Sequence, residues 1–214
     1  MGESGNHRAI RKRSPLSRLA RRVLVALYHW KGWRIAGTRP DQRKFVITAA
    51  PHTTNWDFAF FIGATHSLRI RPSFMGKISL FRWPLRRFMF DMGGLPVDRA
   101  KRGNYVDAAI AAFAERDELA LVIAPEGSRT SNGEWRTGFY HIALGAGVPV
   151  VPAWVNHETM RGGLGPPIMP SGNFGEDLAK IAAFYRSVMP DCPRFAALAQ
   201  QARTLISQAG QNDG

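Results

Sequence analysis

A histidine and an aspartate stand five positions apart in the stretch Ala-Pro-His-Thr-Thr-Asn-Trp-Asp-Phe, which covers residues 50–58. On one continuous helix, residues at this spacing are turned about 140° from each other, so they meet only if a turn intervenes. With a turn at 53–55, Asp57 can bond one ring nitrogen of His52 and leave the other nitrogen to accept a proton. The pair therefore predicts a general base that works without a protein nucleophile.

The flanking sequence predicts where this pair lies. Residues 45–49, Phe-Val-Ile-Thr-Ala, have the pattern of a short buried strand, and Pro51 ends it because proline has no backbone N–H. Residues 53–55 are Thr-Thr-Asn, whose side-chain oxygens can cap a new helix. We thus expect the histidine between a strand and a helix, although the motif alone also fits a helix-capping loop with a hydrogen-bonded histidine.

Strand patterns and helix patterns alternate along the rest of the chain. The apolar run at 119–124 predicts a central strand that is buried on both faces, and residues 148–155 predict another extended segment. The stretch 156–174 is rich in Gly and Pro and predicts a loop. Helices are expected at 58–64, 104–115, 139–146, 177–188 and 193–207. This alternation predicts a single α/β domain with a largely parallel central sheet flanked by helices.

Positive charge is concentrated in two segments. The chain has net charge +13, and residues 1–34 hold nine Lys or Arg and one Glu, which gives 9 − 1 = +8. Within them, residues 15–33 show apolar side chains at helical spacing with arginines between them, the pattern of an amphipathic helix. Residues 67–102 hold nine Lys or Arg and two Asp, which gives 9 − 2 = +7, and at 80–90 they interleave aromatics with arginines.

The N-terminal helix permits two interpretations. A basic amphipathic helix with aromatic residues at its end suits the interface of an anionic membrane. The same pattern also fits a solvated helix that packs on the domain. We therefore divide the chain into a basic segment with an amphipathic helix at 1–34 and a domain at 35–214.

Composition excludes several classes of protein. With 45% hydrophobic and 21% charged residues, the chain is expected to be globular rather than disordered. It contains no run of about 18 apolar residues, so no transmembrane helix is expected, and no cleavage site of a signal peptide is recognisable. One cysteine, Cys192, excludes an internal disulfide and a cysteine-rich metal site. Neither a metal nor a cofactor is expected.

Four stretches in this order resemble the motifs of the glycerolipid acyltransferases, the family that contains bacterial 1-acyl-glycerol-3-phosphate acyltransferase. The family motifs are His-x4-Asp, Gly-x-x-Phe-Ile-Asp-Arg, Phe-Pro-Glu-Gly-Thr-Arg-Ser and a Val-Pro-x-x-Pro strand, and the resemblance covers roughly residues 45–155. The matching residues here are His52 and Asp57; Gly93, Asp98 and Arg99; Pro125, Glu126, Gly127 and Arg129; and Val148, Pro149 and Pro152.

The resemblance implies a chemistry that the residue types also support. A fatty acyl group would move from acyl-CoA or acyl-carrier protein to a hydroxyl of a lysolipid, with His52 and Asp57 as the catalytic pair. Arg99 and Arg129 would bind the acceptor's phosphate, because a guanidinium fork fits phosphate oxygens. Glu126 and Gly127 would complete the acceptor site, with Glu126 bonding hydroxyls or holding an arginine. No Ser or Cys elbow motif is present, so no covalent acyl-enzyme is implied.

The resemblance also implies attachment to a membrane, but it leaves the headgroup of the acceptor lipid open. Lipid substrates imply peripheral attachment to an anionic membrane surface, and the single Cys192 fits a reducing environment such as the cytoplasmic face. Pro96, Ala124 and Arg136 depart from the residues that are usual in the family motifs or near them, which leaves the acceptor's headgroup open.

Two other functions compete with this one. A basic nucleic-acid-binding module without catalysis would explain the isoelectric point near 11.0, but it assigns no role to His52, Asp57 or the Pro-Glu-Gly loop. The chain also lacks a helix-turn-helix, zinc or RNA-recognition signature, so no nucleic acid is expected as a partner. A His/Asp metal hydrolase would need a further ligand cluster, and His66, His141 and His157 show no ligand spacing.

Overall fold

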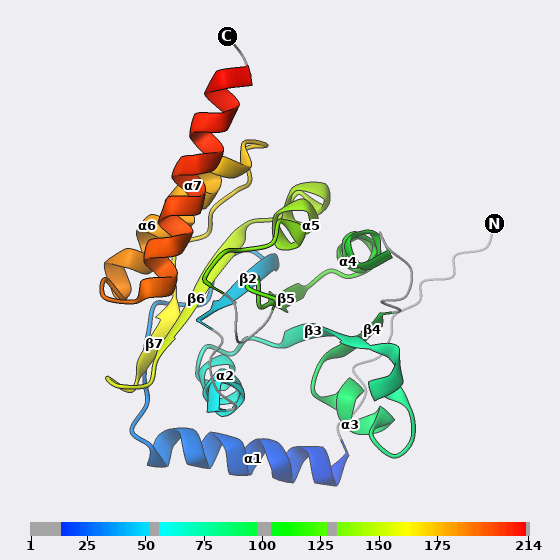
Figure 1. The fold of residues 1–214 in the computed structure, drawn as a ribbon. Coiled ribbons are helices and arrows are strands. Elements are labelled where there is room, and N and C mark those ends of the chain that lie inside the picture. The colour runs from blue at the N-terminus through cyan, green and yellow to red at the C-terminus, as the bar shows by residue number, and fades with distance from the viewer. Residues whose placement is uncertain (1–13, 52–55, 98–103, 128–131, 213–214) are drawn as a thin grey trace, which may run out of the picture.

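A seven-stranded sheet with helices on both faces forms the centre of the protein (Figure 1). The computed structural model describes residues 14–51, 56–97, 104–127 and 132–212. All neighbouring strands are parallel except β6 and β7, so the predicted α/β fold with a largely parallel sheet is confirmed. From edge to edge, the strands are β1 (Arg34–Ala36), β7 (Arg161–Leu164), β6 (Val150–Asn156), β2 (Lys44–Ala50), β5 (Leu119–Ile123), β3 (Pro72–Lys77) and β4 (Gly94–Val97).

The helices form unequal layers on the two faces of the sheet. Figure 1 shows α2 on one face, with α1 lying across the outside of α2, and the four later helices on the opposite face. A short 3-10 helix and α3 lie near the N-terminal end of α1 (Figure 1). The helices are α1 (Pro15–Trp30), α2 (Trp56–Ser67), η1 (Ile78–Phe81), α3 (Arg86–Asp91), α4 (Asn104–Ala114), α5 (Gly138–Ala146), α6 (Phe174–Val188) and α7 (Pro193–Asn212).

Strand β2 contributes to a core on each face of the sheet, because successive strand residues point to opposite sides. Val46 and Ala50 belong to the larger core, which includes buried residues of α4, α5, α6 and α7. Phe45 and Ile47 belong to a smaller core on the α2 side, together with Ile70. Burial on both faces explains why β2 reads as an almost continuous apolar run.

Helix α1 is docked on the domain by one face only. The Tyr28 ring is 3% exposed and occupies the space that a Cβ on Gly63 of α2 would need. At the other end of α1, Asp91 of α3 accepts hydrogen bonds from the backbone N–H of Ser14 (2.9 Å) and the hydroxyl of Ser17 (2.8 Å). These contacts fix the helix at both ends, while its outward face exposes Leu16, Leu19, Val23 and Trp30.

One segment differs from what the sequence predicts. The expected loop at 156–174 contains β7, a strand with two glycines that fits because a Cβ on Gly163 would overlap the carbonyl oxygen of Ala36 in β1. This strand depends on contact with β1, which sequence periodicity does not report. In the basic aromatic stretch 80–90, η1 and α3 are separate, and Pro84 lies between them.

Within the described ranges, none of the helices has the combination of length and apolar character needed to cross a bilayer.

Candidate active site

The site lies where three adjacent strands end on the same edge of the sheet. Strands β6, β2 and β5 are neighbours and run parallel, so their carboxyl ends point the same way. The register pairs Thr48 with Ile123 and Ala50 with Trp154. Residues that follow these strands therefore meet at one edge, which is where ligands bind in open α/β sheets.

Asp57 stands in the first turn of α2, directly beyond the carboxyl end of β2. Its side chain is nearly buried, with 10% of its surface exposed. A carboxylate is favoured in the first turn of a helix, because the unpaired backbone N–H groups there carry partial positive charge. The helix start thus holds a buried negative charge at the edge of the sheet.

His157 is a partner of this carboxylate. Its Nε2 lies 2.6 Å from Oδ1 of Asp57. An ionised carboxylate can only accept hydrogen bonds, so the imidazole N–H donates. The two residues stand 100 positions apart, and the fold brings them together because β6 is the neighbour of β2.

The turn after β6 determines where the His157 ring points. The Asn156 side chain accepts hydrogen bonds from the backbone N–H groups of Glu158 (2.9 Å) and Thr159 (3.0 Å), which closes the turn locally. The His157 ring also packs edge-on against Trp33, with 5.2 Å between the ring centroids. The imidazole is therefore held from two sides.

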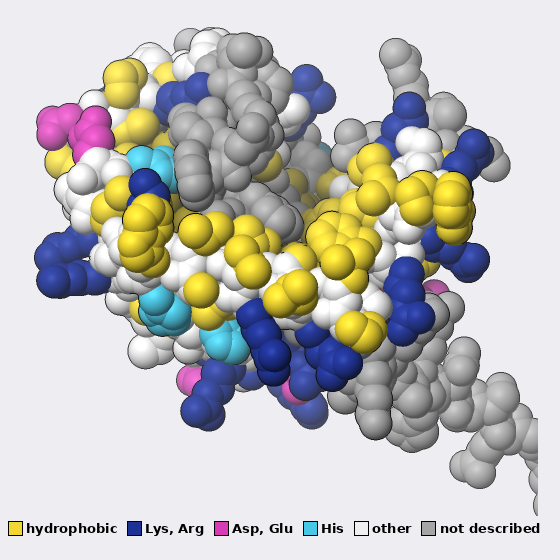
Figure 2. All heavy atoms as spheres, turned by 90° about the horizontal axis from the view of Figure 1, so that it is seen from below, with side chains coloured by type: hydrophobic (Ala, Val, Ile, Leu, Met, Phe, Trp, Pro, Cys, Tyr) yellow, Lys and Arg dark blue, Asp and Glu magenta, His cyan; other side chains and the backbone are white. Residues whose placement is uncertain are grey.

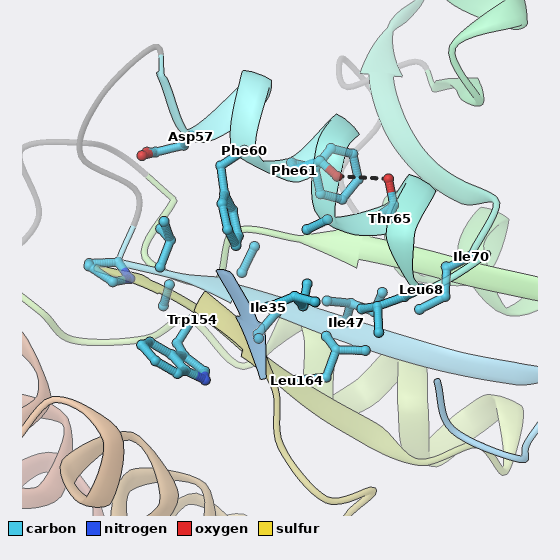
Figure 3. A pocket seen from close by; sticks show the side chains of 17 residues that line it. Ile35, Ile47, Asp57, Phe60, Phe61, Thr65, Leu68, Ile70, Trp154 and Leu164 are labelled. Atoms are coloured by element: carbon cyan, nitrogen blue, oxygen red, sulfur yellow. Dashed lines mark hydrogen bonds between the residues drawn. The ribbon is translucent and has the colours of Figure 1, made fainter. Parts of the chain in front are cut away.

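An apolar pocket extends between α2 and the sheet, and Asp57 lies at one end of it (Figure 3). Figure 3 shows Leu68 and Ile70 at the opposite end, with Phe60 reaching from α2 toward the strands. The pocket holds about 570 Å³ of empty space, its open mouth included. Its lining is almost entirely hydrophobic, with Asp57 as the charged group that faces it. This arrangement suits a ligand with a long apolar part and a reactive end beside Asp57.

A second buried carboxylate follows β5. Glu126 is 4% exposed, and its Oε2 accepts a 2.6 Å bond from the guanidinium of Arg194 in the first turn of α7. Gly127 has φ +71°, and a Cβ at that position would crowd the Arg136 side chain. Glycine thus allows the loop to lie directly against an exposed arginine.

The hydroxyl of Tyr185 in α6 bridges two strands of the site, β2 and β6. It donates toward the carbonyl oxygens of Thr48 (2.6 Å) in β2 and Ala153 (3.1 Å) in β6. Burial raises the pKa of the Tyr185 phenol far above its usual value, so the group stays neutral. We assign it to the support of the site rather than to proton transfer.

The structure places only part of the predicted site. Asp57, Glu126 and Gly127 lie at the predicted edge of the sheet. His52, Arg99 and Arg129 lie outside the described residues, as do the capping residues expected at 53–55. Sequence reasoning missed His157 and Arg194, which bind the buried carboxylates of Asp57 and Glu126.

A metal centre has no support in the part of the chain that the structure describes. No group of three or more His, Cys, Asp or Glu side chains there is arranged to hold an ion.

The chain is similar in sequence to acyltransferases. The model of the family described as Acyltransferase matches residues 34–156, which include β2, β5 and β6. The 1-acyl-sn-glycerol-3-phosphate acyltransferases of Salmonella typhimurium and Salmonella typhi are each 27% identical to this chain over 163 residues. Each match covers 67% of this chain and 64% of the relative, so the chain spans less than two thirds of their length.

A solved structure supports the fold. The crystal structure of the 1-acyl-sn-glycerophosphate (LPA) acyltransferase PlsC from Thermotoga maritima superposes with a TM-score of 0.55 at 18% sequence identity. The match covers 89% of this chain and 79% of that chain. It includes most of the segment after residue 156, which the family model does not reach.

Proposed function

Because the chain belongs to the acyltransferase family, we propose that it moves a fatty acyl group from a thioester donor to a hydroxyl of a lysophospholipid of the lysophosphatidic acid type. The donor is acyl-CoA or acyl-carrier protein. One observation carries the proposal: a buried carboxylate, Asp57, stands at one end of an apolar pocket at the carboxyl edge of a parallel sheet. A substrate with a hydrocarbon chain and a reacting carbonyl at its end fits that combination.

The proposed reaction needs a base and no covalent intermediate. His52, oriented by Asp57, takes the proton from the acceptor hydroxyl as its oxygen attacks the thioester carbonyl carbon. A tetrahedral intermediate forms, the carbon–sulfur bond breaks, and the thiolate leaves and receives a proton. The products are the acylated lipid and the free thiol of the donor.

The acceptor's phosphate is assigned to the basic residues around two loops. We give Arg99 and Arg129 the main contacts, because a planar guanidinium pairs well with phosphate oxygens. Glu126 and Gly127 shape the loop that presents the acceptor. In the described residues, Arg136 packs directly against Gly127, so positive charge already borders this loop.

The acyl chain is assigned to the apolar pocket under α2. Burying hydrocarbon there is favourable at about 0.8 kcal/mol per CH₂ group. The end of the pocket at Asp57 then presents the carbonyl end of the chain to the catalytic pair.

We propose peripheral attachment to an anionic membrane, at its cytoplasmic face, through α1 and the η1–α3 segment. Figure 2 shows hydrophobic side chains in a band along α1 and a second group over η1 and α3, with Lys and Arg at the margins. Among the large hydrophobic residues of the described ranges, Trp83 at 91% and Trp30 at 76% are the most exposed. Arg82, Arg86 and Arg87 are exposed beside Trp83.

The chemistry of this surface favours a lipid surface over a protein partner. An exposed apolar band of this kind marks an interaction site. Tryptophan is favoured at the boundary between lipid and water, and each arginine near an anionic surface contributes about 1 kcal/mol. Attachment would hold α2, and so the pocket behind it, one helix layer from the lipid that supplies the substrate.

An acyl-transfer assay tests the proposed function. The purified full chain is incubated with acyl-CoA or acyl-carrier protein and a panel of lysophospholipids in mixed micelles, and both free thiol and lipid product are measured. We expect acylation of acceptors with an exposed phosphate, at a strongly reduced rate in Asp57→Asn. Release of thiol without acylated lipid, or no release with any acceptor, would overturn the proposal.

A further inference from the structure

We propose that His157 is a positioning residue for Asp57: its ring N–H fixes the orientation of the carboxylate at one end of the pocket. The catalytic meaning of this contact rests on the proposed function, whereas the contact itself rests on geometry. Neither the family motifs nor the family model, which ends at Asn156, includes this histidine.

The distance and the burial of the two side chains make this contact strong. The Nε2 to Oδ1 distance is 2.6 Å, short even for a hydrogen bond to a charged group. The Asp57 side chain is 10% exposed and that of His157 is 29% exposed, so water competes little for the carboxylate. The torsion that turns an aspartate's carboxylate has a broad, shallow profile. A short bond to one oxygen therefore limits that rotation.

His157 and Trp33 together hold the first turn of α2. The Trp33 ring packs edge-on against His157, and its centroid lies 4.7 Å from that of Phe60. Phe60 stands three positions after Asp57 on α2, so both residues project from the same side of the helix. The helix start is thus held at two points, through its carboxylate and through an aromatic ring that lines the pocket.

This arrangement favours positioning over metal binding or an isolated surface pair. The two side chains supply two ligands, and no group of three or more such side chains occurs in the described residues. A surface pair would not be wedged between a turn closed by Asn156 and a tryptophan ring. For a reaction in which Asp57 orients a base, a fixed carboxylate lowers the cost of reaching the reactive geometry.

Two substitutions at His157 separate hydrogen bonding from simple packing. His157→Ala removes the donor, whereas His157→Gln keeps an amide N–H that can reach the same oxygen. We expect kcat to fall about 10–100-fold in His157→Ala, as for other residues that orient a reactive group, with acceptor KM within about twofold. His157→Gln should recover most of that loss. His141→Ala, on the exposed surface of α5, is the matched control and should leave kcat unchanged.

A double-mutant cycle with Asp57 completes the kinetic test. If His157 acts through Asp57, then His157→Ala in an Asp57→Ala background should cause little further loss of kcat. Equal kcat values for His157→Ala and His157→Gln would overturn the proposal. So would losses that multiply in the double variant. Thermal unfolding of each variant shows that the comparison is between folded proteins.

A spectroscopic measurement keeps this inference separate from the proposed function. The imidazole ¹⁵N and ¹H signals of His157, assigned by its loss in His157→Gln, should shift in Asp57→Ala because the hydrogen bond is lost. If the wild type transfers no acyl group but the signal shifts, the proposed function is wrong and the positioning contact stands. A signal that does not respond to Asp57→Ala would overturn the contact itself.

Discussion

Glu126 and Arg194 form a 2.6 Å ion pair between the loop after β5 and the first turn of α7, across 68 positions of sequence. The Glu126 side chain is 1% exposed, so the arginine neutralises a charge that would be costly to bury alone. The C-terminal helix thereby takes part in holding the loop that carries the Pro-Glu-Gly motif.

Arg194→Ala should destabilise the protein by about 1–3 kcal/mol, because it leaves a buried carboxylate without its main partner. Urea unfolding followed by circular dichroism measures this change. Arg203→Ala, an exposed arginine on the same helix, is the control and should stay within about 0.5 kcal/mol of the wild type. Equal stability of the two variants would show that the pair contributes nothing to the loop.

His52→Ala should lower the rate of acyl transfer by about 10²–10⁴-fold, the range for removal of a general base. The rate is measured from thiol release under saturating donor and acceptor. His66→Ala, at the exposed end of α2, should retain the wild-type rate. Near-normal transfer by His52→Ala would rule out the mechanism.

Leu68→Trp should change which acyl chains are accepted, because Leu68 lies at the end of the pocket farthest from Asp57 (Figure 3). A larger side chain there shortens the pocket, so kcat/KM should fall for long-chain donors and hold for short ones. Overpacking costs about 1–3 kcal/mol, so stability is measured in parallel. Leu144→Trp, at an exposed position of α5, is the control. The same loss for every chain length would contradict this use of the pocket.

Replacing both exposed tryptophans, Trp30→Ser and Trp83→Ser, should weaken sedimentation with anionic vesicles. Arg86→Gln with Arg87→Gln should remove mainly the part of binding that high salt also removes, since charge attraction is screened by salt. Ile206→Ser, an exposed apolar residue on α7, should leave binding unchanged. If neither pair of substitutions affects vesicle binding, this surface is not the attachment site.

Asp91→Asn should loosen α1 at neutral pH but not in acid. Burial alone would raise the pKa of Asp91, but hydrogen bonds from the backbone N–H of Ser14 and the hydroxyls of Ser17 and Ser14, with the charge of Arg87, bring it below its ordinary value of 3.8. A carboxyl whose pKa is lower in the folded state stabilises the protein above pH 3.8 and loses that effect as the pH falls through the lower value.

The measurement is urea unfolding of wild type and Asp91→Asn at neutral pH and at pH values below 3.8. The stability advantage of the wild type should be present at neutral pH and should narrow as the pH falls. An advantage that is constant across this range would show that the charge of Asp91 is not what holds α1.

The sequence predicts the centre of the fold better than its periphery. Strands β2, β5 and β6 appear as apolar runs because they are buried on both faces, and Pro51 marks the end of β2 at Ala50. Strand β7 gives no such signal, since its glycines are required by close packing against Ala36 and Phe60 rather than by strand propensity.

The candidate site likewise contains residues that the sequence predicts and residues that it does not. Asp57 and Glu126 follow strands that the sequence predicts, so their edge of the sheet could be inferred. His157 and Arg194 could not be found by spacing, because they reach the site from 100 and 68 positions away. One signal was available for His157: it follows the predicted strand at 148–155, and the carboxyl ends of parallel neighbours share an edge.

The stacking order of α1, α2 and the sheet has a mechanical consequence. Helix α2 is a single wall, with the Tyr28 ring of α1 against Gly63 on one side and the apolar pocket on the other. Axes of packed helices are separated by about 8–10 Å, so a displacement of α1 acts directly on the wall of the pocket. A force on the outer helix is thus transmitted to the pocket through one layer of side chains.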